Sequence, residues 1–247
     1  MKNYQSYLPN RAIFTFLIVA LFCSITKADI DSQSSIPTNT ISPNKLYGVT
    51  VPSGSSADPG AIAKENDIVE LSDKKILGCI NAETAFAHMN NLEILPAWWS
   101  SDDSCFLWQV SGPWGMYTQM LICLKGDKIT WQLDVLKVLQ RTILTRTEAV
   151  DSKKFLAAKK ANWGNGSAYP ETFTIDSRAE NANKGPLVFP VRFHVYLTSN
   201  PKGADGIPNL DSSMEAIMSQ DGVIKITKFH YGKSQMAPWN EVQAAGH

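Results

Sequence analysis

Two of the four histidines in this 247-residue chain stand where a side chain could do acid–base chemistry. His194 and His230 each lie near the end of an expected strand, and a tyrosine follows each of them closely, Tyr196 in the first case. If the two strands were neighbours, both imidazoles would share one patch, with Asp176 or Glu171 as an orienting carboxylate. Such a patch is the minimum for general acid–base catalysis. The alternative, which the sequence favours, is polar decoration of a solvated sheet face.

The seven tryptophans are a second group that could bind a ligand, through the stacking of flat aromatic rings. Trp98, Trp99 and Trp114 are the candidates for an exposed surface that binds a glycan or a protein partner. The competing interpretation, which the sequence favours, is that the tryptophans fill the core and its rim.

Two cysteines are expected to form a disulfide. If a hairpin turns at residues 112–115, Cys105 lies directly opposite Cys123. Opposed positions on antiparallel strands have a Cα separation that suits a disulfide. The bridge would close a loop of about 17 residues, which stabilises the fold by about 3 kcal/mol on the chain-entropy model. A bridge from Cys79 to either partner, or three reduced core cysteines, are the alternatives.

No metal or cofactor site is expected. The chain has no Cys-x-x-Cys or Cys/His cluster, no Gly-x-Ser-x-Gly elbow and no phosphate-binding loop. Asp205, Asn209 and Asp211 surround a Gly/Pro-rich loop and offer oxygen ligands for Ca²⁺, but their spacing does not fit an EF-hand.

One short motif, Cys105-x-x-Trp108-x-x-x-Gly112, resembles part of the cysteine-rich signature of TraU-type periplasmic conjugation proteins. The match covers eight positions, and the further cysteines that follow in that family are missing here. The resemblance implies a place in the bacterial envelope.

The N-terminus has the three parts of a cleavable secretory signal peptide over residues 1–28. Lys2 and Arg11 provide the positive charge, residues 12–25 are apolar and uncharged, and small residues precede the expected cut after Ala28. The chain is therefore expected to be exported, as a periplasmic or secreted protein.

Two alternatives to cleavage are disfavoured. A retained membrane anchor would need roughly 20 apolar residues, whereas this run has about 14. Lipidation at Cys23 would need a small preceding residue, and Phe22 stands there. No stable membrane span is expected after cleavage.

Composition divides the remaining chain into three parts. Residues 29–66 are rich in Ser, Pro and Asn and are predicted to be a flexible tether, with a short strand expected within 45–51. Residues 67–235 are predicted to form a single α+β domain, and residues 236–247 a loosely ordered tail. Hydrophobic residues make up 44% of the chain, enough for a core, and a formal net charge of zero favours no nucleic-acid partner.

Periodicity predicts the elements that position these residues. Alternation of apolar and polar side chains indicates strands at 105–111, 116–124, 129–135, 173–175, 187–197 and 223–231. Helical spacing and capping residues indicate helices at 72–90, 151–161 and 209–218. Pro190 lacks an N–H, so its strand should lie at a sheet edge or carry a bulge. The expected fold is α+β, a mainly antiparallel sheet of five to six strands with two to four helices packed on one face.

Together these observations favour an exported, non-catalytic protein of the bacterial envelope. It would be an accessory of a secretion or conjugation system, with envelope or secretion-system proteins as partners. Two other hypotheses stay open. One is a secreted enzyme that uses a His194/His230 patch, and the other is a secreted glycan- or ligand-binding module that uses exposed tryptophans.

Overall fold

The computed structural model describes residues 34–52, 66–81, 93–94, 96–112, 115–160, 173–182, 184–199 and 210–232. Within these residues the chain is mostly antiparallel β-sheet with two α-helices, so the predicted α+β class is confirmed. The described strands are divided among sheets of five, four, three and two strands, instead of the expected single sheet of five to six. The expected signal peptide and C-terminal tail lie outside the described residues.

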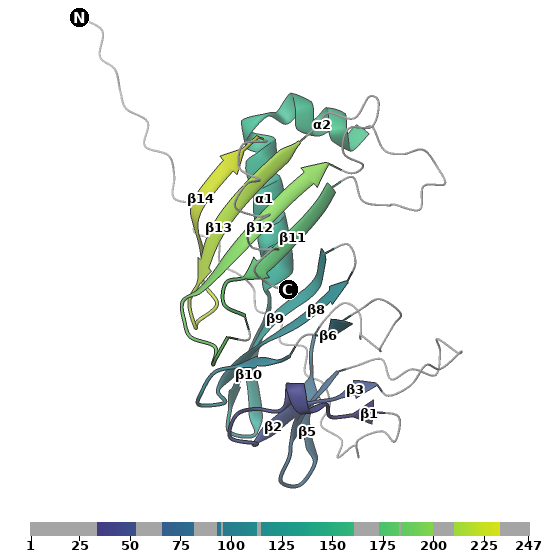
Figure 1. Cartoon of the computed structure of the whole chain (residues 1–247), viewed down its shortest axis with the longest axis vertical. Helices are drawn as coiled ribbons and strands as arrows, with labels where there is room; N and C mark the ends of the chain where they lie inside the picture. The colour runs from purple at the N-terminus through teal and green to yellow at the C-terminus, as the bar shows by residue number, and fades with distance from the viewer. Residues whose placement is uncertain are drawn as a thin grey trace, which may run out of the picture.

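The five-stranded sheet lies in the middle of the molecule and is built on a long hairpin (Figure 1). Strand β8 (Cys105–Gly112) pairs with β9 (Gly115–Lys125), and β9 pairs with β10 (Lys128–Asp134). Two short strands, β6 (Glu93–Ile94) and β7 (Trp98–Trp99), pair with the other edge of β8. The hairpin that the alternation predicted is therefore confirmed.

The two helices follow β10 directly. Helix α1 (Val135–Val150) begins at Asp134, whose side chain accepts a hydrogen bond from the Lys137 backbone N–H at 2.9 Å and so caps the helix. Helix α2 (Ser152–Lys160) follows after Asp151, which caps it in the same way through the Lys154 N–H.

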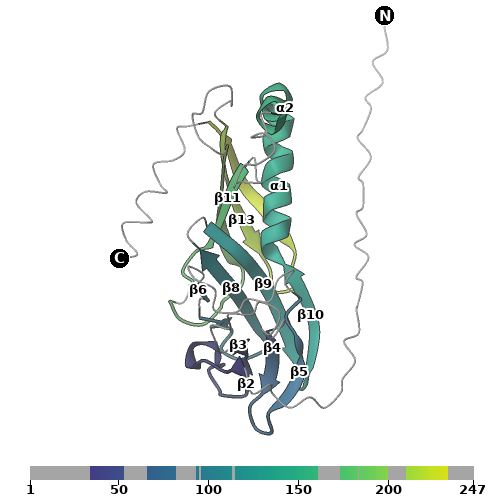
Figure 2. The same cartoon turned by 90° about the vertical axis from the view of Figure 1, so that its right-hand side faces the viewer.

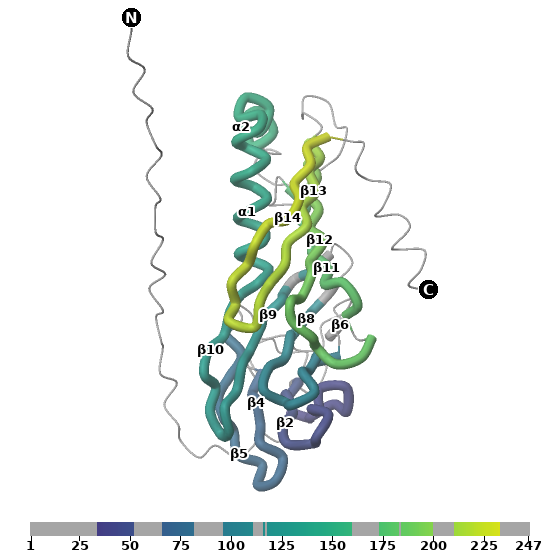
Figure 3. Tube along the Cα trace, turned by 90° about the vertical axis from the view of Figure 1, so that its left-hand side faces the viewer, coloured from purple at the N-terminus to yellow at the C-terminus, as the bar shows by residue number. Residues whose placement is uncertain are grey.

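The four-stranded sheet follows the helices and runs in chain order, with every neighbour antiparallel. Its strands are β11 (Phe173–Ala179), β12 (Val191–Ser199), β13 (Asp211–Met218) and β14 (Ile224–Tyr231). Helix α1 lies along one side of these strands (Figures 2 and 3). The described residues leave the other side of the sheet uncovered, and the candidate site lies there.

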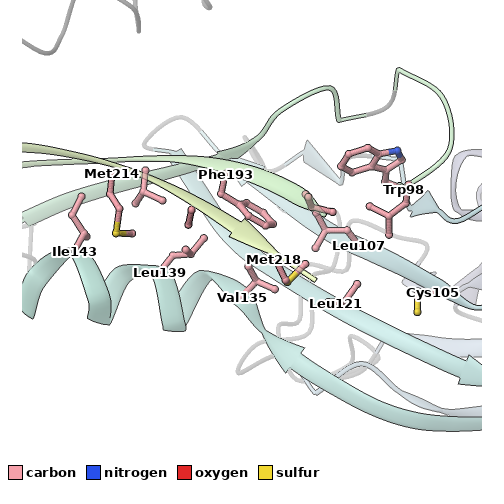
Figure 4. Packing of buried hydrophobic residues seen from close by; sticks show 14 of the residues in the cluster. Trp98, Cys105, Leu107, Leu121, Val135, Leu139, Ile143, Phe193, Met214 and Met218 are labelled. Atoms are coloured by element: carbon pink, nitrogen blue, oxygen red, sulfur yellow. The ribbon is translucent and has the colours of Figure 1, made fainter. Parts of the chain in front are cut away.

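Helix α1 packs on the sheet through a stripe of apolar side chains at i, i+4 spacing. Val135, Leu139 and Ile143 are fully buried and lie against Phe193 and Met214 of the sheet (Figure 4). This packing occupies the apolar side of β12 and β13, so their polar side chains must face away from the helix.

The β8–β9 hairpin separates two hydrophobic cores, because successive side chains of a strand point to opposite faces. Leu107 and Leu121 lie on the face that packs against α1 and the four-stranded sheet. Phe106, Trp108 and Ile122 lie on the other face, in a second core shared with the three-stranded sheet.

Part of the segment predicted to be a flexible tether is folded, and it supplies one strand of the three-stranded sheet and both strands of the two-stranded sheet. Residues 34–52, expected to be flexible, supply β1 (Ser34–Ser35), a 3-10 turn (Thr38–Thr40), β2 (Tyr47–Val49) and β3 (Val51–Pro52). Strand β2 pairs with β4 (Asp67–Glu70), which pairs with β5 (Lys75–Cys79). A few apolar side chains are enough to hold this segment in place, because Tyr47, Val49 and Val51 are buried in the second core. The short strand expected within 45–51 is confirmed at the edge of this sheet.

Two predicted helices are strands in the part of the chain that the structure describes. Residues 75–79 of the expected helix 72–90 form β5, which follows a tight turn where Lys74 has a φ of 58°. Residues 211–218 of the expected helix 209–218 form β13, whose buried residues alternate with half-buried ones. In both cases strand pairing with a neighbour buries the apolar residues, and it outweighs the local capping signals.

The strand predicted at 187–197 begins later, at Val191, after a cis peptide bond between Phe189 and Pro190. Pro190 therefore precedes β12 instead of lying within it. The strand is also interior, between β11 and β13, so the expected edge position is wrong. Leu187 is nevertheless buried, and its N–H donates to the Trp99 carbonyl at 2.7 Å.

Candidate functional site

The candidate site is the side of the four-stranded sheet that faces away from α1, here called the open polar face. It is polar because the apolar residues of β12 alternate with polar ones and point to the helix. Its side chains come from all four strands and from the turn after β11. They include Asp176, Arg178, Glu180, Arg192, His194, Tyr196, Thr198, Asp211, Ser213, Glu215, Lys225, Lys228 and His230.

The two histidines of the predicted patch lie on this face but are not brought together. His194 on β12 lies opposite Glu215, and His230 on β14 lies opposite Ser213, so β13 runs between them. Two strand spacings of about 4.8 Å each put the imidazoles beyond hydrogen-bond reach of one another. The assumption that their strands are neighbours is therefore wrong.

The carboxylates proposed to orient a histidine do not do so among the described residues. Asp176 lies opposite Tyr196 and forms an ion pair with Arg178 at 3.3 Å. Glu171 lies outside the described residues. Among the described residues, the Oε2 atom of Glu180 lies 3.7 Å from His194 Nε2.

Charged side chains link across the open polar face in a chain of ion pairs. Arg192 contacts Glu180 at 3.1 Å and Glu215 at 3.4 Å, and Lys228 contacts Glu215 at 3.0 Å. The ammonium of Lys228 holds the pKa of the Glu215 carboxyl below its usual value. Because these groups are partly exposed, each pair contributes little stability, and the chain of pairs mainly sets the charge pattern of the surface.

One buried carboxylate organises the end of this face. The Oδ1 atom of Asp211 accepts hydrogen bonds from the Tyr196 hydroxyl at 2.7 Å and the Thr198 hydroxyl at 2.9 Å. Burial, with the hydrogen bond to Asp211, raises the pKa of the Tyr196 phenol well above its usual value. A phenol held in this way stays protonated at neutral pH, so Tyr196 is unsuited to act as a base there.

Of the three residues that offer oxygen ligands for Ca²⁺, one, Asp211, lies within the described residues. Asp205 and Asn209 lie outside them, and the Asp211 carboxylate is engaged by two hydroxyls. Among the residues that the structure describes, no group of three or more His, Cys, Asp or Glu side chains could hold a metal ion.

The tryptophans proposed for ligand binding are buried where the structure describes them. Trp98 is 6% exposed and donates its Nε1–H to the Gly185 carbonyl at 2.8 Å. Trp99 is 3% exposed and stacks on Phe106, with ring centroids 4.1 Å apart. These two rings do not form an exposed binding surface, because β7 pairs with β8 and lies between the two cores. Trp114 lies outside the described residues.

The disulfide expected from the sequence is present. Cys105 and Cys123 are directly opposed on β8 and β9, with Cα atoms 4.1 Å apart and a sequence separation of 18. Both half-cystines are buried on the face that packs toward α1. The third described cysteine, Cys79, takes no part in this bridge, and its Sγ lies 4.0 Å from Asn81 Oδ1.

A buried polar contact that was not predicted from the sequence joins the two sheets. Gln119 on β9 donates to Gln109 Oε1 at 3.3 Å and to the Ser177 carbonyl at 3.2 Å, and it accepts from the Ser177 hydroxyl at 2.7 Å. All three side chains are buried, so the contact ties the hairpin to β11. The signal was present, because alternation puts both glutamines on the core face, directly opposite one another.

The chain matches no family model, no curated protein and no solved structure. The resemblance to TraU-type proteins thus rests on the eight positions of the sequence motif alone. Within the described residues, neither helix is long and apolar enough to cross a membrane.

Proposed function

We infer that the protein is exported and acts as a non-catalytic component of the bacterial envelope or periplasm, an accessory of a secretion or conjugation system. The observation that carries this proposal is the bridge between Cys105 and Cys123, in the hairpin that both cores share. Disulfides form and persist in oxidising compartments and are rare in the cytosol. The export-type pattern of residues 1–28 supports the same compartment.

The geometry of the open polar face supports a binding role. Strand β13 keeps His194 apart from His230, and the Tyr196 phenol is held protonated by Asp211. The face instead presents charges of both signs beside hydroxyl groups, which suits electrostatic complementarity with a protein partner. We place the contact with envelope proteins on this face.

The proposal is tested by expressing the chain with its own export segment in a bacterial host. We expect a processed chain in the periplasmic fraction, with Cys105 and Cys123 protected from alkylation until a reductant is added. We expect envelope proteins to co-purify with it. A full-length cytosolic chain with both cysteines alkylated would contradict export.

Paired charge reversals locate the contact. Lys225→Glu with Lys228→Glu changes the open polar face and should release the co-purified envelope proteins. Lys125→Glu with Lys128→Glu makes the same change of charge at the β9–β10 turn and should retain them. An exported, folded chain that purifies alone, without any of these proteins, would contradict the accessory role.

A further inference from the structure

Helix α2 presents a mixed basic and apolar surface to solvent. Phe155 and Ala158 are buried on its inner side, whereas Lys153, Leu156 and Ala157 are exposed on the opposite side. Leu156 is 44% exposed and is one of five large apolar side chains that are exposed among the described residues. Val150, at the end of α1, is 57% exposed at the same corner of the molecule.

The helix is held firmly, so this surface has a defined shape. The Phe155 ring stacks on Phe173, with centroids 4.9 Å apart, and both contact Leu210 in a separate small core. Asp151 caps the helix through the Lys154 N–H at 3.0 Å and accepts a hydrogen bond from the Tyr231 hydroxyl at 3.2 Å. The exposed face of α2 is therefore displayed on a rigid support.

Positive charge is concentrated on α2. The whole chain has a formal net charge of zero, yet α2 has no acidic residue and four lysines, Lys153, Lys154, Lys159 and Lys160. The corner is also the extreme end of the folded body, with α2 at the top of Figure 1 and the β9–β10 turn near the opposite end. Among the described residues, α2 lies beyond the ends of the strands, so a flat surface would meet it before the sheets.

We propose that α2 docks on the surface of an anionic phospholipid bilayer. Apolar side chains at the centre of a helix face, flanked by lysines, are the pattern of helices that lie in a membrane interface. Leu156 and Val150 would enter the headgroup region, and the exposed Lys153 and Lys159 would extend along the surface to meet the phosphates. This surface is separate from the open polar face, where Glu180 and Glu215 form ion pairs with Arg192 and Lys228.

The exposed apolar side chains favour a bilayer over other anionic partners. Nucleic acid attracts lysines through its phosphates but leaves Leu156 and Val150 without apolar surroundings. A bilayer offers phosphates to the lysines and an apolar interior to Leu156 and Val150. The contact is reversible, because one short helix inserts only shallowly, and it goes beyond the proposed accessory role without depending on any protein partner.

The test measures co-sedimentation of the exported, processed protein with lipid vesicles. We expect binding to phosphatidylcholine vesicles that contain about one third phosphatidylglycerol, weakening as salt is added, and little binding to pure phosphatidylcholine. Each lysine near an anionic surface is worth about a fivefold change in affinity, so Lys153→Glu with Lys159→Glu should weaken binding by about 25-fold or more.

Two further variants make the test specific. Lys125→Glu with Lys128→Glu makes the same change of charge near the far end and should leave vesicle binding unchanged. Leu156→Ser keeps every charge and should weaken binding about fivefold, since it removes the side chain that enters the interface. Circular dichroism checks that each variant keeps its fold.

Three results would overturn the proposal. One is equal binding to neutral and anionic vesicles, and another is equal weakening by the two lysine pairs. The third is no vesicle binding by a protein that still binds a polyanion such as heparin through α2, which would assign the surface to a soluble anionic partner. Each of these results leaves the proposed accessory role standing, because export and co-purification are measured separately.

Discussion

At the scale of single residues, Asp211 shows how one buried carboxylate can hold a strand junction. It joins the start of β13 to β12 through the hydroxyls of Tyr196 and Thr198. Hydrogen bonds to a charged group are worth about 1.5–3 kcal/mol each, more than the exposed ion pairs nearby. Asp211 therefore fixes the positions of two side chains at the buried end of the open polar face.

Replacing Asp211 with asparagine should lower the free energy of unfolding by about 1–3 kcal/mol, since the charged acceptor is lost. The pKa of Tyr196 is raised in the folded state, so its contribution is complete below pH 10 and is lost as the pH rises above 10. The variant should have a lower Tyr196 pKa and hence lose less stability above pH 10. Urea unfolding and phenolate absorbance across pH 8–12 measure both effects.

The control for this prediction is Tyr196→Phe, which should remove one phenol from the late-titrating absorbance and leave the part due to Tyr47 and Tyr231, whose pKa values are also raised. An Asp211→Asn variant with unchanged stability and an unchanged phenol titration would show that the Tyr196–Asp211 bond has no energetic role.

At the scale of elements, the turn between β13 and β14 depends on a glycine that touches another sheet. Gly222 has a φ of 79°, and a Cβ there would lie 3.1 Å from the Trp131 ring of β10. The turn therefore needs glycine both for its backbone and for the close approach of β10.

Gly222→Ala should destabilise the protein by about 2–4 kcal/mol, because backbone strain adds to overpacking. The matched control is Gly126→Ala, with a φ of 58° and open space around its Cβ, which should cost only about 1–2 kcal/mol of strain. Chemical denaturation compares the two free energies. Equal losses would mean that the contact with Trp131 does not constrain the turn.

At the scale of the whole molecule, the β8–β9 hairpin couples two cores, because each of its faces belongs to a different one. Leu107 belongs to the core with α1, and its neighbour Phe106 belongs to the core with the three-stranded sheet. The disulfide and the Gln119 contact lie on the same hairpin. Losing either core therefore exposes one face of the shared strands β8 and β9.

We expect one cooperative unfolding transition for this reason. Leu107→Ala should lower the unfolding free energy by about 2–5 kcal/mol and Phe106→Ala by about 3–5 kcal/mol, each moving the same midpoint. Far-ultraviolet circular dichroism and tryptophan fluorescence should give coincident curves. Two separate transitions, with each variant moving only one, would show that the cores are independent.

Local features were predictable from the sequence because they depend on near neighbours in the chain. Period-two alternation and a short turn identified the β8–β9 hairpin, and the spacing of Cys105 and Cys123 then identified their bridge. Helical spacing predicted helix α2, and alternation predicted strand β14. The polar character of the face that carries His194 and Tyr196 also followed from alternation in β12.

Only the tertiary structure decided which strands are neighbours and which aromatic residues are buried. Alternation shows which side of a strand is apolar, but it does not show that β13 runs between His194 and His230. Burial of Trp98 and Trp99 depends on layers drawn from distant parts of the chain, including residues 34–52. The exposed face of α2 likewise became visible only once Phe155 and Ala158 had their partners in Phe173 and Leu210. These are sums of contacts over the whole molecule, whereas the export pattern, the hairpin and its bridge are each set within a short stretch of sequence.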